Sequence, residues 1–152
     1  MSVTTDKRTP TNPKFETGEA FKTLAVYTVT VCKSEKNFPK RNRWMLTQEI
    51  VKAAVKAYGH AVEANAVEVM TMRDYELRRE HQVKARAKLK KLSAYTEIAL
   101  LALGLDATKI DVWQGYVKTC KDLLGKWRES DRKRYKKLLE EQQRQYGHAG
   151  DG

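Results

Sequence analysis

The sequence predicts an all-α protein, and more narrowly an antiparallel up-and-down four-helix bundle. Glycine and proline number only 8 and 3 in 152 residues, which is typical of long helices joined by few turns. Apolar residues recur at three- and four-residue spacing in four successive segments, the pattern of amphipathic helices. The connections between these segments are short, which favours antiparallel neighbours. A chain of this length can bury a core without disulfides or metals.

The first predicted helix begins near Thr17 and ends before Pro39, because the residue ahead of a proline is disfavoured in the helical conformation. Its expected core face consists of Phe21, Leu24, Ala25, Thr28, Val31 and Cys32. Two cysteines without CxxC spacing, Cys32 and Cys120, are expected to be buried free thiols. No signal peptide or membrane span is visible, so we expect a cytoplasmic protein.

The second predicted helix runs from Asn42, its expected N-cap, to the low seventies. We expect its apolar face to include Ile50, Val51, Ala54, Val55, Tyr58, Ala61, Val62 and Val69. Asn65 falls on the same side, where it would make a hydrogen bond within the bundle or distort the helix; we favour the hydrogen bond.

The third predicted helix runs from Tyr75 to Leu103, with Asp74 as its cap and Gly104 as its stop. The fourth opens at "TKID", where Thr108 and Asp111 resemble a capping box. Residues 16–139 therefore form the expected bundle, and residues 1–15 and 140–152 are expected to be flexible tails. The expected core faces are Ala85, Leu89, Leu92, Thr96, Ala99 and Leu103, then Trp113, Tyr116, Val117, Cys120, Leu124 and Trp127.

Positive charge is concentrated in the third and fourth helices. The net charge is +11, too extreme for a typical enzyme of this size and attractive to polyanions. Helical geometry arranges the cations in three nearly single-signed stripes, which a phosphate backbone would neutralise. A solvated helical face is the alternative. The candidate nucleic-acid contacts are Arg79, Arg86 and Lys90, then Lys84, Lys88 and Lys91, and finally Lys118, Lys121, Arg128, Arg132 and Lys136.

Small and apolar residues of the third helix project opposite its core face. Outward apolar residues often mark contacts between subunits, so we expect a homo-oligomer. An alanine-rich composition chosen for helix propensity is the alternative. The candidate interface residues are Val83, Ala87, Ala94, Ile98 and Leu101.

No catalytic constellation is visible in the sequence. The histidines His60, His81 and His148 are scattered, without a neighbouring cysteine or carboxylate at metal-ligand spacing. Phosphate-binding, nucleophile-elbow and zinc-protease motifs do not occur in the 152 residues. We therefore expect a protein that is not an enzyme, with no metal and no cofactor.

The stretch "NFPKRNRW" joins the first two predicted helices. Phe38 is expected to pack under the turn and Trp44 to anchor the helix start. Its three cations lie near a helix N-terminus, where anions are favoured. We expect this corner to bind a partner through Lys40, Arg41 and Arg43.

Three stretches together resemble the accessory variability determinant family of diversity-generating retroelements: "FPKRNRWMLTQEI", "YELRREHQVKARAKLKKLSAYTEIALLALGL" and "VWQGYVKTCKDLLGKWRES". The resemblance covers about residues 21–130. It depends on the order and spacing of short motifs, which map onto Phe38, Pro39, Lys40, Arg43 and Leu46, and onto Gly125 and Trp127. The wider group includes proteins encoded in ribosomal-RNA intervening sequences. Those usually carry a "NIAEG"-like stretch where this chain has "AVEANAVEV", which favours the retroelement branch.

The resemblance implies a basic four-helix bundle that assembles into a barrel-shaped homopentamer. It also implies binding to the retroelement's reverse transcriptase and its template RNA during error-prone cDNA synthesis, with DNA as a second candidate nucleic acid. We therefore expect a non-catalytic accessory protein of mutagenic retrohoming, with no membrane partner. A bundle of the ribosomal-RNA intervening-sequence type, or an adaptor that binds only an acidic protein, remains the alternative.

Overall fold

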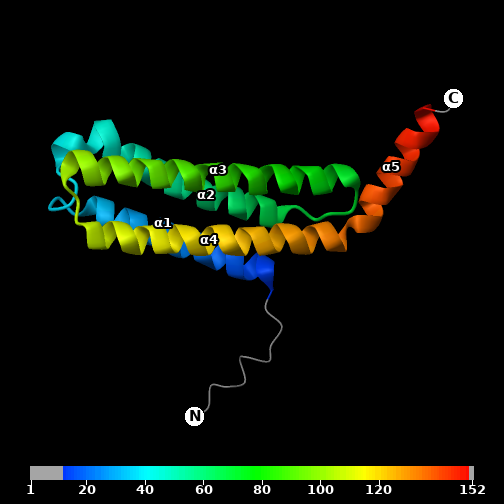
Figure 1. The fold of residues 1–152 in the computed structure, drawn as a ribbon, viewed down its shortest axis with the longest axis horizontal. Coiled ribbons are helices and arrows are strands. Elements are labelled where there is room, and N and C mark those ends of the chain that lie inside the picture. The colour runs from blue at the N-terminus through cyan, green and yellow to red at the C-terminus, as the bar shows by residue number, and fades with distance from the viewer. Residues whose placement is uncertain (1–11, 151–152) are drawn as a thin grey trace, which may run out of the picture.

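The structure is a computed structural model that describes residues 12–150, and within that range its regular elements are all helical. Five α-helices are joined by short segments: α1 (Pro13–Lys33), α2 (Gln48–Ala66), α3 (Met72–Leu103), α4 (Ala107–Arg134) and α5 (Lys136–Gly150). A 3-10 turn (Lys40–Asn42) and a π-helical turn (Arg43–Thr47) precede α2 (Figure 1). The predicted all-α class is confirmed.

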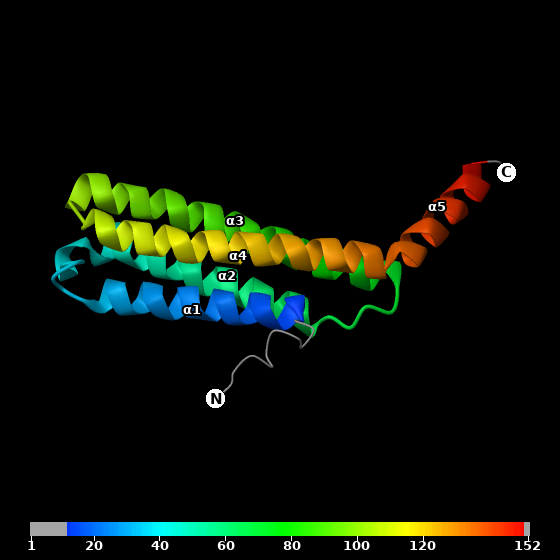
Figure 2. The same cartoon turned by 60° about the horizontal axis from the view of Figure 1, so that its bottom comes forward.

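The long helices α1 to α4 lie side by side, and α5 projects from one end (Figures 1 and 2). Helix α2 packs against α1 and α3, and α4 packs against the same two helices. This arrangement is a helical bundle with a shared core. In the part of the chain that the structure describes, no helix combines the length and apolarity needed to cross a membrane.

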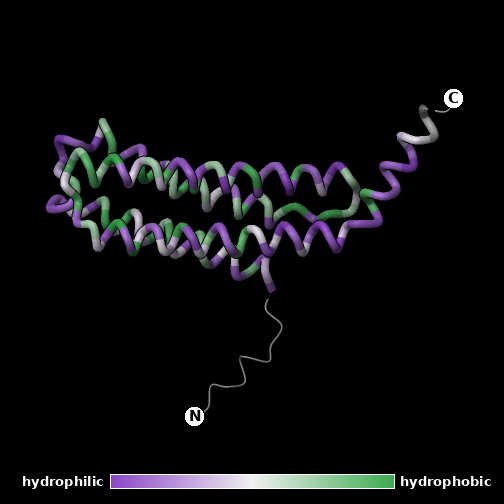
Figure 3. The backbone as a smooth tube through the Cα atoms, viewed as in Figure 1, coloured by the Kyte–Doolittle hydropathy of each residue, from purple (hydrophilic) through white to green (hydrophobic). Residues whose placement is uncertain are grey.

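The core is centred on Trp113, which is fully buried. Its indole Nε1 donates a hydrogen bond to Thr28 Oγ1 at 2.9 Å, so the ring's one polar atom is satisfied. Tyr27 and Phe38 pack edge-on against the same ring, with centroids 5.8 and 6.4 Å away. Every residue predicted for the core face of α1 is buried, as is Phe38 under the turn. Along the tube of Figure 3, apolar and hydrophilic segments alternate through the bundle, while α5 is largely hydrophilic.

Helix α2 differs from the prediction. Its buried residues are Ile50 and five alanines, which let the neighbouring helices approach closely. Val55 and Val62 are nearly half exposed, because at about 100° per residue they lie roughly 140° and 120° from Ile50 around the helix. Asn65 is exposed, so its predicted bundle hydrogen bond is wrong. The helix ends at Ala66 and not in the low seventies.

The starts of α1 and α2 also differ from the prediction. Asn12 Oδ1 accepts a hydrogen bond from the backbone N–H of Lys14, and Pro13 occupies the first helical position. This is the preferred place for proline, so α1 begins four residues before Thr17. At α2, Asn42 is buried but makes no capping hydrogen bond; the 3-10 and π-helical turns lead into the helix instead.

Helices α3 and α4 are capped by residues just upstream of those predicted. Thr71 caps α3 in a capping box, in which Asp74 occupies the third helical position and its carboxylate accepts from the Thr71 N–H. Asp106 caps α4 by accepting from the N–H of Thr108. The predicted stop at Gly104 is confirmed: its φ of 66° is the left-handed conformation that glycine adopts without strain.

The two predicted tails have different outcomes. Residues 1–11 and 151–152 lie outside the described residues. From residue 140 onward the chain was expected to be a flexible tail, but it belongs to α5, which begins after a break at Tyr135 and continues to Gly150. The boundary of the four long helices is therefore at Arg134, five residues earlier than the predicted end at 139.

Candidate nucleic-acid interface

An open groove of about 420 Å³ lies between helices α3 and α4 and is lined by three arginines. Arg79 projects from α3, and Arg128 and Arg132 project from α4. All three are among the predicted nucleic-acid contacts. Glu76 and Glu129 also line the groove, so its charge is mixed but mainly positive.

Hydrogen-bonded pairs define how α3 and α4 are aligned along this groove. Ser93 Oγ donates to Gln114 Oε1 at 3.0 Å, and Gln82 Nε2 donates to Asp131 Oδ2 at 3.1 Å. Residue numbers therefore rise along α3 while they fall along α4, and the two helices run in opposite directions.

This alignment brings two predicted stripes together. Arg86 of α3 lies at the level of Lys121 of α4, and Lys90 lies at the level of Lys118. Arg79 of one stripe and Arg128 and Arg132 of the other line one groove, although the sequence had presented the two stripes as separate faces. Lys136, the last predicted member of the α4 stripe, lies in α5, beyond the break at Tyr135.

Ion pairs neutralise part of this charge, which corrects the expectation of nearly single-signed stripes. Lys118 Nζ lies 3.0 Å from Asp122, and Lys84 Nζ lies 3.0 Å from Glu80. Arg132 donates two hydrogen bonds to Glu129, at 2.8 and 3.1 Å, and these bonds lower the pKa of that carboxyl. The acids lie three or four residues from their cations on the same helix, where side chains meet. These exposed pairs can exchange for a phosphate at little cost.

The third predicted stripe does not join the groove. Lys84, Lys88 and Lys91 lie on the flank of α3 that faces α2, since His81 on the same flank contacts α2. Lys91 extends over the ring of Tyr95, with its Nζ 5.6 Å from the centroid. Of the eleven predicted contacts, three line the groove, four others belong to the same two stripes of α3 and α4, three form a separate surface, and Lys136 lies in α5.

A buried ion pair connects α3 and α4 beside the groove. Arg78 donates to Asp131 Oδ1 at 3.1 Å, and their side chains are only 4% and 6% exposed. The guanidinium also donates to the carbonyl oxygen of Val67 at the end of α2 and to Tyr135 Oη. Gln82 donates to the second carboxylate oxygen. The network ties α2, α3 and α4 together and fixes the spacing of the arginines above it.

This network was not identified from the sequence, because neither Arg78 nor Asp131 belongs to a predicted apolar face or to a predicted basic stripe. At 100° per residue, Arg78 lies between Gln82 and Ala85 on the buried side of α3. This position on the core face was the signal in the sequence that Arg78 is buried. Its partner on α4 could not be identified without the packing of the two helices.

The "NFPKRNRW" corner presents its cations to solvent. Lys40, Arg41 and Arg43 are exposed, and Lys40 Nζ lies 3.4 Å from Glu35. Trp44 is 80% exposed, so its predicted role as an anchor of the helix start is wrong. The π-helical turn rotates Trp44 outward and buries Leu46 instead.

The five candidate interface residues of α3 are all exposed in the single chain: Val83, Ala87, Ala94, Ile98 and Leu101. Leu101 is 85% exposed. Beside it, Met45, Ile98 and Tyr95 line a hollow of about 340 Å³ between α3 and the start of α2. The outward apolar face therefore lies where the sequence placed it, unoccupied by any other part of the described chain.

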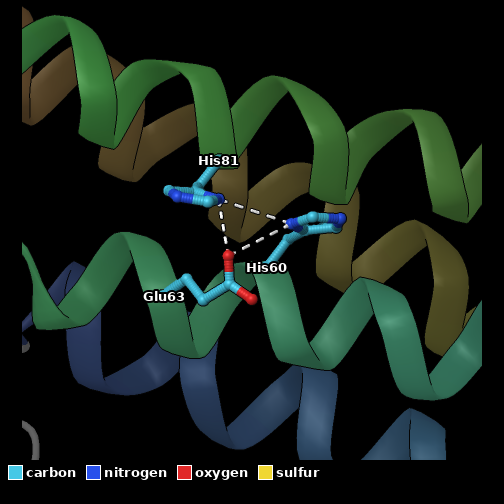
Figure 4. A group of neighbouring side chains, drawn as sticks. All are labelled: His60, Glu63 and His81. Atoms are coloured by element: carbon cyan, nitrogen blue, oxygen red, sulfur yellow. Dashed lines mark hydrogen bonds and ion pairs between the residues drawn. The ribbon is translucent and has the colours of Figure 1, made fainter.

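Two histidines that the sequence presented as scattered lie together. His60 of α2 and His81 of α3 stack with ring centroids 5.6 Å apart, and Glu63 of α2 reaches both (Figure 4). The expectation that no carboxylate neighbours a histidine is wrong, because His60 and Glu63 are three residues apart on one helix face. Burial lowers the pKa of His60; Glu63 acts in the opposite direction, and His81 and nearby lysines add to the lowering.

Comparisons with protein-family models, with characterised proteins and with solved structures find no match for this chain. The assignment of a function therefore depends on the residues and on the geometry described above.

Proposed function

We propose that this chain is a non-catalytic accessory protein of a diversity-generating retroelement, which binds template RNA or cDNA together with the reverse transcriptase. The groove between α3 and α4 is the observation that carries the proposal. Cations from two helices border it on both sides, and a positively charged groove is the usual means of tracking a nucleic-acid backbone.

The chemistry of the groove favours phosphate over base recognition. Arginine binds phosphate oxygens in a bidentate manner, and three arginines line the groove. Contacts to phosphate position a nucleic acid without reading its sequence. An accessory protein that must accompany a reverse transcriptase along a template would need this kind of binding.

The proposal includes the assembly that the resemblance implies. In it, the four long helices form an antiparallel up-and-down bundle, and copies of the bundle associate into a barrel-like homopentamer through the outward face of α3. The apolar side chains exposed there support this contact. The cations of the corner, Lys40, Arg41 and Arg43, would then remain available to the reverse transcriptase.

Binding of a labelled single-stranded RNA at 50 mM salt tests the proposal. The triple variant R79Q/R86Q/R128Q removes three cations of the two stripes that meet at the groove and should weaken binding by more than about 10-fold. A matched control, K22Q/K52Q/K56Q, removes the same charge from exposed lysines of α1 and α2 and should bind as the unmodified chain does. Absence of RNA and DNA binding at this salt, or equal loss in both variants, would refute it.

A protein-only adaptor is the alternative that one observation favours. Arg132 and Lys118 already bind carboxylates of their own helix, so the same groove can accept acidic side chains. Such an adaptor would capture an acidic protein partner in place of RNA; a chain that is itself a bundle of the ribosomal-RNA intervening-sequence type is the other alternative. Purification of the chain from cells with its bound molecules separates the two, because nuclease treatment would release a nucleic-acid partner only.

A further inference from the structure

We propose that His60, Glu63 and His81 form a binding site for one Zn²⁺ ion, which links α2 to α3 and leaves one coordination position open to solvent. The cluster lies on the flank of α3 opposite the groove, so the proposal is independent of nucleic-acid binding. Three side chains from two helices contribute one donor atom each.

The distances fit a single ion. His81 Nδ1 lies 2.9 Å from Glu63 Oε2, His60 Nδ1 lies 3.7 Å from the same oxygen, and the two Nδ1 atoms are 3.4 Å apart. Zinc binds imidazole nitrogen and carboxylate oxygen at about 2.0–2.2 Å with tetrahedral geometry. That geometry requires donor atoms about 3.3–3.5 Å apart, so shifts of a few tenths of an ångström would complete the site.

The orientation of the rings supports a shared ligand. In each histidine the Nδ1 atom faces the cluster and the other ring nitrogen points away (Figure 4). A direct hydrogen bond between two neutral Nδ1 atoms requires that one of them carries a proton and the other a lone pair, so the pair is unsatisfied when both histidines adopt the same tautomer. A metal ion would satisfy both lone pairs and the carboxylate at once.

The ligand set favours zinc among divalent ions. Two imidazoles and one carboxylate suit zinc and other late first-row metals, whereas magnesium and calcium require oxygen ligands. Zinc sites with three protein ligands usually hold a water or another ligand in the fourth position. Glu63 is half exposed while the two histidines are mostly covered, which places that fourth position on the solvent side.

Two lysines near the cluster carry positive charge, which opposes the binding of a cation. Lys84 and Lys88 lie on the same flank of α3 as His81, and both act on His60. Lys84 is 3.0 Å from Glu80 and is thereby partly neutralised. The exposed carboxylate of Glu63 offsets the remaining charge at the ion itself.

Titration of Zn²⁺ into the full-length, untagged chain, after treatment with a chelator, tests the site by calorimetry. We expect one ion per chain and a rise in Tm with Zn²⁺, because a ligand that binds only the folded state stabilises it. The variants His60→Gln and His81→Gln should each weaken binding by at least about 10–100-fold. Co²⁺ should replace zinc and show the visible absorption of a four-coordinate site.

Glu63→Gln keeps the test decisive if a histidine variant folds poorly, since this exposed side chain carries little of the bundle's stability. It should weaken Zn²⁺ binding while its circular dichroism and its Tm without metal stay unchanged. His148→Gln is the matched histidine control and should bind as before. Absence of binding to the unmodified chain, or binding that all three ligand variants retain, would show a hydrogen-bonded triad only and overturn the proposal.

Discussion

Salt dependence offers the sharpest measure of how many groove cations meet phosphate. Five cations of the two stripes that meet at the groove form no ion pair among the described residues: Arg79, Arg86, Lys90, Lys121 and Arg128. For a single-stranded nucleic acid, log K falls against log[salt] with a slope of about −0.7 per phosphate contact. Five contacts predict a slope of about −3.5, which corresponds to a loss of about 100-fold between 50 and 200 mM salt.

Removing three of these charges should change the slope by a calculable amount. With two contacts left, R79Q/R86Q/R128Q should show a slope of about −1.4 and lose only about 7-fold in affinity over the same range. Because these side chains are exposed or half-exposed and distant from the core, the variant should fold normally.

Fluorescence anisotropy with a labelled 20-nucleotide RNA, measured at five salt concentrations, would determine both slopes. The matched variant K22Q/K52Q/K56Q should keep the slope of the unmodified chain, since its lysines lie on α1 and α2. A slope near zero in the unmodified chain would mean that phosphate is not the ligand. Equal flattening in both variants would mean that overall charge, and not the groove, attracts the RNA.

The remaining predictions concern assembly, stability and the thiols. Leu101→Asp should convert an oligomer to monomers in light scattering without lowering Tm, since the side chain is exposed in the single chain; a monomeric unmodified chain would contradict this. Asp131→Ala should cost about 3–5 kcal/mol in urea unfolding, because it leaves a buried guanidinium unpaired, whereas Asp122→Ala on the surface should cost less than about 1 kcal/mol. Burial raises the pKa of Cys32 and Cys120 from an ordinary 9.0 to about 12. Each buried thiol therefore contributes stability that is fully present below pH 9 and is lost as the pH rises toward 12. A thiol reagent at pH 9 should label only unfolded chains, and rapid labelling of the folded protein would refute this reasoning.

Local patterns predicted the helices well where one face is clearly apolar. All six residues predicted for the core face of α1 are buried, and Gly104 ends α3 in the conformation that only glycine adopts easily. In α2 the apolar residues are distributed around the helix, so periodicity could not tell the alanine face from the valine face. In the structure the alanine face is buried, because the small side chains let α1 and α3 pack closely against that side of α2.

The sequence predicted individual residues of the candidate site but not how they are arranged into one surface. Helical spacing identified the cations of Arg79 and Arg128, yet only the alignment of α3 with α4 places them across one groove. Arg78 is the opposite case. A charged side chain is usually exposed to solvent, but the ion pair with Asp131 of α4 stabilises Arg78 in the core. Charge counted along the sequence does not distinguish these situations, because desolvation depends on neighbours from other helices.

By itself the sequence determined the all-helical class, the excess of positive charge, the buried thiols and the outward apolar residues of α3. These follow from composition and from a 3.6-residue period, which are properties of one segment at a time. The tertiary structure alone decided that arginines of two basic stripes line one groove, that Arg78 and Asp131 pair in the core, and that His60, Glu63 and His81 converge. Each of these joins side chains from different helices, and their meeting depends on how those helices pack, which no local period encodes.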